Sequence, residues 1–197
     1  MYELPTSVEV NNQIFNIRNG ADYRTILAVI DLCQDVELTQ EERMVSALLV
    51  FYEGLSDVDD IDLFGENLDE AISAMMNFIS CNKDEEIGAK SNHKLIDWVQ
   101  DEKLIVSAIN NVAKTEIRAL PYLHWWTFIS YYMSIGECTL STVVGIRDKV
   151  ARGKKLEKYE QEFKRENPQY FRWKNDELEA DNLLATIWNQ DKKGGNE

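Results

Sequence analysis

Cysteine and histidine are scarce in this sequence of 197 residues, which has three cysteines and two histidines. Cys33, Cys81 and Cys138 lie far apart in the chain, so their spacing matches no disulfide framework and no zinc site. Neither His93 nor His124 has a cysteine or a carboxylate at ligand spacing beside it. The sequence therefore predicts reduced, mostly buried cysteines of a cytoplasmic protein, and it predicts no metal site.

Long apolar runs and glycine-rich motifs are also missing. No stretch of about 18 uncharged apolar residues is present, and the N-terminus lacks a basic region followed by an apolar one. We therefore expect neither a membrane span nor a signal peptide. The nine glycines form neither a phosphate-binding loop nor a Gly-x-Ser-x-Gly elbow. We expect a protein without catalytic residues and without a cofactor, and not an enzyme.

Basic residues are too few to balance the acidic ones, because the chain has 35 acidic and 21 basic residues and a net charge of −14. The imbalance lies in residues 1–100, which hold 20 acidic and 6 basic residues. Such a surface repels nucleic acid and anionic membranes, so we expect neither as a partner. Residues 147–165 carry a net charge of +4. This is a weak nucleic-acid footprint and is more typical of a solvated helix face.

Aromatic residues are concentrated in residues 120–136, of which seven are aromatic if His124 is counted. Apolar side chains at helical spacing cover most sides of this segment. Pro121 suits the first turn of a helix, and Gly136 suits the residue after its end. The pattern predicts a central helix over residues 121–135 around which the other helices pack. An aromatic ligand site is the alternative, although aromatic side chains at helical spacing more often form a core.

The remaining periodicity predicts a mainly α fold, a multi-helix bundle with a short N-terminal β-hairpin. Asn11 and Asn12 separate the two strand patterns, and asparagine tolerates the positive φ of a tight turn. One helical region, from Lys94 to about residue 112, is either one helix or two helices broken near Glu102. The other predicted helices cover about residues 23–34, 40–53, 68–79, 140–150 and 156–166.

Polar residues at the starts of these patterns predict helix caps. We expect caps at Asp22, at Thr39 with Glu42 in a capping box, at Asn67 with Glu70, and at Thr139. An i, i+4 ion pair between Glu160 and Lys164 is also expected.

An acidic stretch, residues 56–66, has the composition of a calcium loop without its spacing. A loop that began at Asp60 would have Ala71 at its twelfth position, where a bidentate carboxylate is needed. We expect a solvated acidic loop instead.

The predicted subdomains are residues 1–81, with the hairpin, and residues 94–167, with the central helix. Residues 82–93 are polar and lack periodicity, so they are predicted to link the two, although one compact unit also fits. Residues 168–197 are predicted to be a tail with an amphipathic helix. Its apolar face would dock on the core or be offered to a partner, and it consists of Ala180, Leu183, Leu184, Ile187 and Trp188.

Several strings of residues resemble the bacteriophage gp-fifteen family of Gram-positive siphophages and prophages. The most specific is Tyr122-Leu-His-Trp-Trp-Thr-Phe128. Asp97-Trp98 followed by Gln100-Asp101 is a second. The resemblance covers roughly residues 1–170, and the remaining strings are residues 1–10, 18–27, 116–121, 146–147, 153–156 and 162–163.

The resemblance implies a protein of phage tail morphogenesis, and from its gene position a tail assembly chaperone in the host bacterial cytoplasm. Such a chaperone holds the helical tape measure protein soluble until tail tube subunits surround it. The major tail protein and a second copy of the chain are further expected partners. The alternatives are a completion or connector protein retained in the virion, and a nucleic-acid-associated protein that uses residues 147–165.

For the chaperone we expect helix-in-groove binding, in which adaptable apolar side chains at the rim of a groove cover a partner helix. The candidate partner-binding residues are Met75, Met76, Tyr122, Trp125, Trp126, Leu184 and Trp188.

Overall fold

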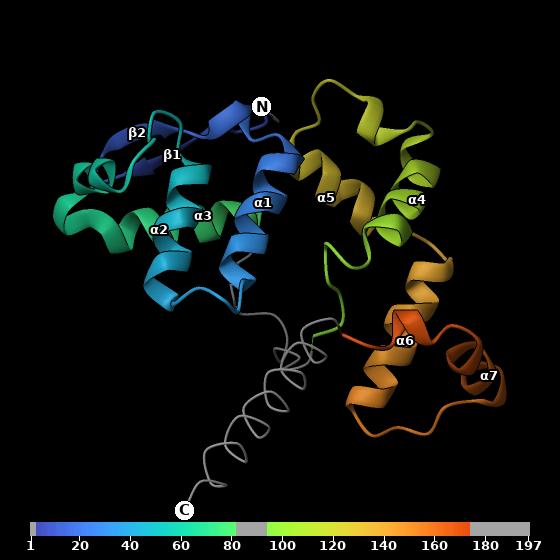
Figure 1. Cartoon of the computed structure of the whole chain (residues 1–197). Coiled ribbons are helices and arrows are strands. Elements are labelled where there is room, and N and C mark those ends of the chain that lie inside the picture. Colours follow the sequence, from blue (N-terminus) through green and yellow to red (C-terminus); the bar gives the residue numbers. More distant parts are fainter. Residues whose placement is uncertain (1–2, 82–93, 174–197) are drawn as a thin grey trace, which may run out of the picture.

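A computed structural model describes residues 3–81 and 94–173 of the chain. The fold is mainly α with one two-stranded hairpin, as predicted (Figure 1). The hairpin, α1, α2 and α3 lie on one side of α5, and α4, α6 and α7 lie on the other. The elements are β1 (Ser7–Val10), β2 (Gln13–Asn16), α1 (Tyr23–Gln34), α2 (Gln40–Phe51), α3 (Leu68–Ile79), α4 (Glu102–Ala113), α5 (Trp125–Met133), α6 (Thr139–Ala151) and α7 (Lys158–Glu166), with short 3-10 turns at Arg18–Gly20, Val58–Leu63, Gly65–Asn67, Ile117–Ala119 and Pro168–Tyr170.

The hairpin turns where the sequence predicts. Asn11 and Asn12 both have positive φ, 47° and 59°, and β1 pairs with β2 antiparallel. The Asn11 N–H donates to Glu70 Oε1 of α3 at 2.9 Å. Glu70 therefore holds the hairpin against α3 instead of capping that helix. Asn67 likewise makes no side-chain cap to α3 in the described part of the chain.

Helices α1 and α2 begin at the predicted caps. The Asp22 carboxylate accepts the N–H of Arg24, and Thr39 and Glu42 form a complete capping box. Arg18 donates from Nη2 to carbonyl oxygens at and beyond the C-terminus of α2, including that of Tyr52. A cation there complements the partial negative charge of the helix end.

The acidic stretch is more ordered than a solvated loop. It forms 3-10 turns, and the carboxylate of Asp60 accepts the N–H groups of Ser56 and Asp57. Ile61 and Phe64 point into the core and are buried. The apolar residues between the acids therefore anchor this segment, which the prediction of a loop missed.

Helix α5 is shorter than the predicted 121–135 because it begins at Trp125 and ends at Met133. Pro121 lies before the helix and not in its first turn. Gly136 lies two residues after the C-terminal cap, which is Ser134. His124 is the cap: its Nδ1 accepts the N–H of Trp126 at 3.0 Å, and its Nε2 lies 2.8 Å from the Pro5 carbonyl oxygen. The neutral tautomer with hydrogen on Nε2 satisfies both contacts.

The segment before α4 is not helical. That helix begins at Glu102, residues 98–101 form a turn, and residues 94–97 have no regular structure. In α6 the cap is Cys138, whose N–H donates to Ser141 Oγ, and not Thr139. Glu160 pairs with Lys149 of α6 at 2.7 Å instead of with Lys164. Helix α6 thereby holds α7.

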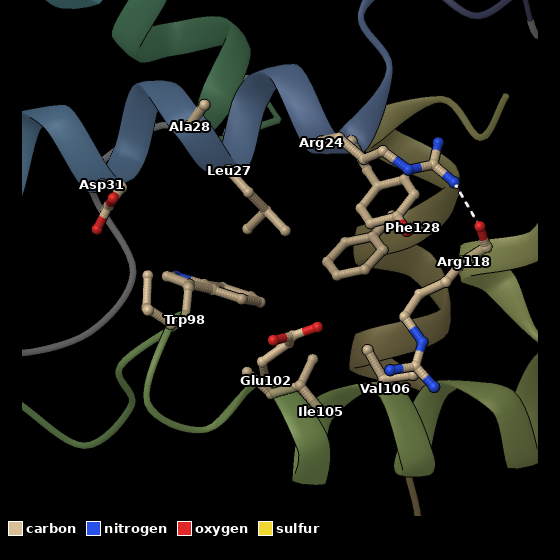
Figure 2. A pocket seen from close by; sticks show the side chains of 12 residues that line it. Arg24, Leu27, Ala28, Asp31, Trp98, Glu102, Ile105, Val106, Arg118 and Phe128 are labelled. Atoms are coloured by element: carbon tan, nitrogen blue, oxygen red, sulfur yellow. Dashed lines mark hydrogen bonds between the residues drawn. The ribbon is translucent and has the colours of Figure 1, made fainter.

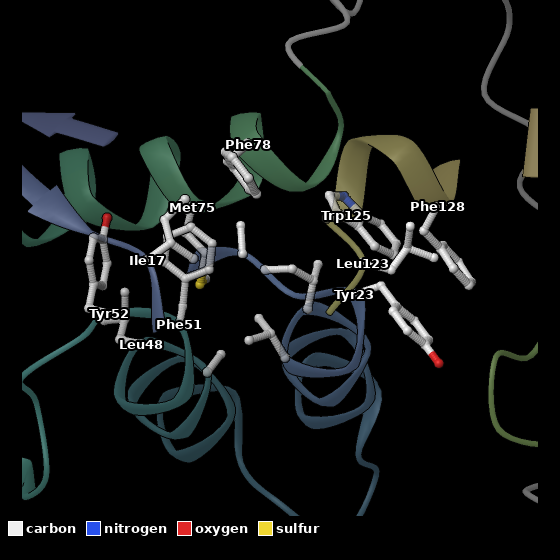
Figure 3. Close-up of a cluster of buried hydrophobic side chains, with 14 of the residues drawn as sticks. Ile17, Tyr23, Leu48, Phe51, Tyr52, Met75, Phe78, Leu123, Trp125 and Phe128 are labelled. Carbon is white, nitrogen blue, oxygen red and sulfur yellow. The ribbon is translucent and has the colours of Figure 1, made fainter. Parts of the chain in front are cut away.

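Most buried apolar side chains form one cluster that runs from the hairpin to Leu140 at the start of α6, and Val143 and Ile146 of α6 are buried outside it. Figure 3 shows its centre, where Phe51 of α2 lies against Met75 of α3, and Tyr23 of α1 lies beside Leu123 and Phe128. Trp125 of α5 reaches α3, because its Nε1 donates to the carbonyl oxygen of Ile79 at 2.9 Å. A central aromatic helix is therefore confirmed, and its core is shared with the segments on both sides of residues 82–93.

Candidate functional site

Three neighbouring cavities lie beside α1, and Trp98 lines all three. The first lies between α1 and α4 and has a volume of about 380 Å³. The second, of about 290 Å³, lies between the C-terminal end of α1 and residues 94–100. The third, of about 440 Å³, lies where α1 meets the ends of α3 and α5. We call this surface the Trp98 groove.

Helix α1 supplies one wall of the groove because only one side of it packs into the core. Ile26 and Val29 are fully buried, whereas Leu27 is half-buried and points into the first cavity (Figure 2). Tyr23 stacks on Phe128 of α5, with ring centroids 4.7 Å apart and planes 7° apart. This pair gives the first cavity an aromatic wall.

Trp98 forms the centre of the groove by packing on aromatic side chains of α5. Its ring centroid lies 6.1 Å from those of Trp125 and Phe128 and 5.2 Å from that of Tyr132. The Asp97 carboxylate accepts the N–H groups of the next residues in the turn at 2.7 and 3.0 Å. The indole is therefore held from below by α5 and from the backbone side by its own turn.

A buried ion pair fixes the end of that turn to α6. Arg147 donates to the two carboxylate oxygens of Asp101 at 2.6 and 2.9 Å. The side chains of Arg147 and Asp101 are only 4% and 1% exposed. Arg147 also donates to the carbonyl oxygens of Leu95 and Tyr170. One guanidinium therefore joins both ends of the Trp98 turn to the C-terminal elements.

Three of the ionisable groups in the groove walls favour their neutral forms. Burial raises the pKa of Tyr23, of Cys33 and of Tyr132, and Asp101 adds to the effect at Tyr132. All three groups are therefore uncharged at neutral pH, which keeps the walls suited to apolar side chains.

Large apolar side chains remain exposed around the groove. An apolar rim of this kind on an otherwise charged surface is typical of a protein interaction site. The side chains are Val36, Met76, Val99 and Met133.

The structure divides the predicted partner-binding residues. Met76 is 47% exposed and lines the third cavity, and Trp125, 1% exposed, lies in its floor. Met75 is fully buried beside them, so it is a core residue and not a rim residue. The regular apolar spacing of α3 could not separate these adjacent methionines, because only the packed neighbours decide which one faces inward.

Two other predicted residues lie away from the groove. Tyr122 is exposed, and its hydroxyl donates to the Gly20 carbonyl oxygen at 2.7 Å. Trp126 is half-buried, and its Nε1 donates to the Phe78 carbonyl oxygen at 3.1 Å. Both aromatic residues therefore have structural contacts of their own. Leu184, Trp188 and the predicted linker lie outside the described residues.

Sequence reasoning missed the most important residue of the groove. Trp98 falls within the helical region that was predicted to begin at Lys94, but it lies in a turn. A signal was present, because Asp97 and Asp101 flank the tryptophan and acidic side chains often hold turns through backbone N–H groups. The partner of Asp101 lies far along the chain and has no local signal.

Within residues 3–81 and 94–173, the structure contains no group of histidine, cysteine and acidic side chains that could hold a metal ion. Helices long and apolar enough to cross a membrane are likewise not found in the part of the chain that the structure describes.

Comparison with known proteins gives one match. A family model described as Bacteriophage Gp15 protein matches residues 1–171, which include every element described above. Searches of curated proteins and of solved structures found no match.

Proposed function

The chain belongs to the bacteriophage Gp15 family, and from this premise we propose that it is a non-enzymatic tail assembly chaperone. It binds the phage tape measure protein and keeps that protein soluble until tail tube subunits surround it. The Trp98 groove is the observation that carries the proposal, because it gives a strongly charged protein an apolar, helix-lined surface for a partner.

The wall that α1 forms is long enough for a partner helix to lie along it. Its α1 wall is 12 residues long, which is about 18 Å at 1.5 Å per residue, or slightly more than three helical turns. An amphipathic helix that lies in such a groove presents apolar side chains at i, i+3, i+4 and i+7. A tape measure protein is rich in helical segments of this kind, and their apolar faces need cover from water before the tube forms.

The rim supports exchange among many similar segments. Met76 and Met133 stand at the mouth of the third cavity, and methionine side chains adapt to differently shaped partners. The acidic surface of residues 1–100 keeps a loaded complex soluble by mutual repulsion. A chaperone that covers a long partner with several copies needs both properties.

The first test is co-expression with the tape measure protein of the same phage, followed by affinity purification and size exclusion. We expect a soluble complex, whereas the tape measure protein alone precipitates. If the tape measure protein stays insoluble and this protein elutes alone, the chaperone proposal fails. Detection of the protein in purified virions would then support the alternative, a structural tail component.

The second test asks whether the groove is the binding surface. The double variant Met76→Ser and Val99→Ser removes exposed apolar groups from its two ends and should weaken the complex at least about tenfold, because burial of each side chain contributes on the order of 1 kcal/mol. The matched control is Val58→Ser with Leu63→Ser, whose side chains are also exposed but do not line the groove. Equal retention of the tape measure protein by both double variants would place the site elsewhere.

A further inference from the structure

The first cavity of the groove combines aromatic walls with two carboxylates that form no ion pair within the described residues. Figure 2 shows Glu102 projecting from α4 into the cavity between Trp98 and Phe128, with Asp31 on α1 at the Trp98 end. Neither carboxylate has an ion pair or a hydrogen bond among the described residues. Both side chains belong to exposed residues.

The two arginines that line the same cavity are already paired. Arg24 donates from Nη1 to both carboxylate oxygens of Asp22 at 3.1 Å and from Nη2 to backbone carbonyl oxygens, among them that of Leu120 at 2.8 Å. Arg118 makes a double contact with Glu116 at 2.9 and 3.0 Å. Arg118 also attracts the Glu102 carboxylate beyond ion-pair distance. With Asp22 and Glu116 paired to the two arginines, Asp31 and Glu102 leave the cavity with a net negative charge.

We infer that this cavity receives a lysine or arginine side chain of the bound helix, an inference that rests on the proposed function of the groove. The aliphatic stem of that side chain packs on Leu27 and on the rings of Trp98 and Phe128. Its charged end meets the carboxylate of Glu102, and the negative charge of Asp31 at the Trp98 end adds to the attraction. Long basic side chains commonly bury an apolar stem in this way while the charge stays at the water boundary.

The third cavity explains why the groove needs an apolar contact as well as a charged one. The third cavity, at the other end of α1, is lined by Ile30, Met76 and Ile129 and suits the apolar stripe of the helix. A basic residue at one end sets the register and direction of a helix that would otherwise slide along an apolar surface. The preferred partner helix therefore has a lysine or arginine at one end and an apolar stripe at the other. The basic residue and the far end of the stripe are about two to three helical turns apart, as estimated from the helix rise.

The test uses two designed amphipathic helices of about 20 residues as probes, identical except for one flanking position that is lysine in one and methionine in the other. Binding to the full-length protein is followed by fluorescence anisotropy of labelled peptide. The protein should bind the lysine peptide about tenfold more tightly, with an affinity that falls as salt is added. Asp31→Asn with Glu102→Gln should abolish that preference and leave the methionine peptide unaffected.

The matched control is Asp59→Asn with Asp62→Asn, which removes the same charge from exposed residues outside the groove. It should keep the preference. Equal affinities for the two peptides, retention of the preference in the Asp31 and Glu102 variant, or no binding of either peptide would each overturn the inference. Co-purification with the tape measure protein, measured in parallel for Met76→Ser with Val99→Ser, shows separately whether the groove proposal stands.

Discussion

Arg147 is the residue on which the position of Trp98 depends. Its guanidinium satisfies Asp101 and two carbonyl oxygens from separate segments, and the ring of Trp173 lies 4.2 Å from it. Such a group is costly to bury unless it is paired and hydrogen-bonded to the segments that surround it. Here those segments are the Trp98 turn, α6 and the chain after α7.

The first prediction concerns this ion pair. Arg147→Met should lower the free energy of unfolding by about 3–5 kcal/mol, because it leaves the Asp101 carboxylate buried without a counter-ion. Urea denaturation followed by tryptophan fluorescence measures the change. Arg152→Met is the control on the same helix: its pair with Asp148 is exposed and should contribute less than about 1 kcal/mol. Equal losses of unfolding free energy in the two variants would show that the buried pair of Arg147 with Asp101 does not stabilise the fold more than an exposed pair does.

At the scale of elements, the starts of α1 and α5 support each other. The Asp22 carboxylate caps α1, pairs with Arg24 and accepts the N–H of Leu123 at 3.0 Å. The N–H of Tyr23 donates to the Leu123 carbonyl oxygen and that of Trp125 to the Ala21 carbonyl oxygen. One short backbone ladder therefore sets the angle between the helix that walls the groove and the helix that floors it.

The second prediction is that Asp22→Ala lowers the free energy of unfolding by more than the loss of one helix cap does. The cap contributes about 1 kcal/mol, and the Leu123 N–H left without an acceptor adds about 1–3 kcal/mol. We expect a total loss of about 2–4 kcal/mol in urea denaturation. Thr39→Ala, which removes a cap with no distant contact, should cost only about 1 kcal/mol. A smaller loss of unfolding free energy for Asp22→Ala than for Thr39→Ala would show that Asp22 does not join the starts of α1 and α5.

At the scale of the whole molecule, carboxylates that hold turns make stability depend on pH. Side-chain bonds from Arg118 lower the pKa of Glu116 from its usual 4.5 to about 2. Backbone N–H donors lower the pKa of Glu42 and of Asp60, chiefly those of Thr39 and Ser56 respectively. A carboxylate whose pKa is depressed by folding stabilises the folded state above its unfolded pKa and loses that effect as pH falls through its folded pKa.

The third prediction is that the free energy of unfolding declines as pH falls from about 5 to about 2, since carboxylates of depressed pKa take up protons on unfolding. Glu116→Gln should reduce the slope below pH 4.5, where the usual and folded values of its pKa bracket the change. Glu53→Gln removes an exposed carboxylate without a hydrogen-bond partner among the described residues and should leave the slope as it is. An unchanged slope in Glu116→Gln would contradict the assignment.

The sequence by itself determined the features whose causes lie within a few residues. The Asn11–Asn12 turn, the cap at Asp22 and the Thr39 capping box are all confirmed, because turn chemistry and capping depend on side chains that reach their own neighbouring backbone. The mainly α fold follows from the same local periodicity. The family strings add to this reading and agree with the family match.

Only the tertiary structure decided where polar side chains at element ends find their partners. Glu70 bonds to the hairpin turn and Glu160 pairs with Lys149, although the sequence predicted a local partner for each. Asp101 pairs with Arg147, for which the sequence carries no local signal. Helix α5 begins at Trp125 and not at the predicted Pro121, because His124 pairs with Asp22 at the start of α1.

The Trp98 groove is likewise a product of packing. Its walls come from α1, α4, residues 94–100 and the ends of α3 and α5, which the sequence places far apart. Local pattern shows which side chains are apolar, but which of them face a cavity depends on how much of each helix its neighbours cover. Met75 and Met76 are adjacent in the chain, and only the packing of α3 against the core buries the first and exposes the second.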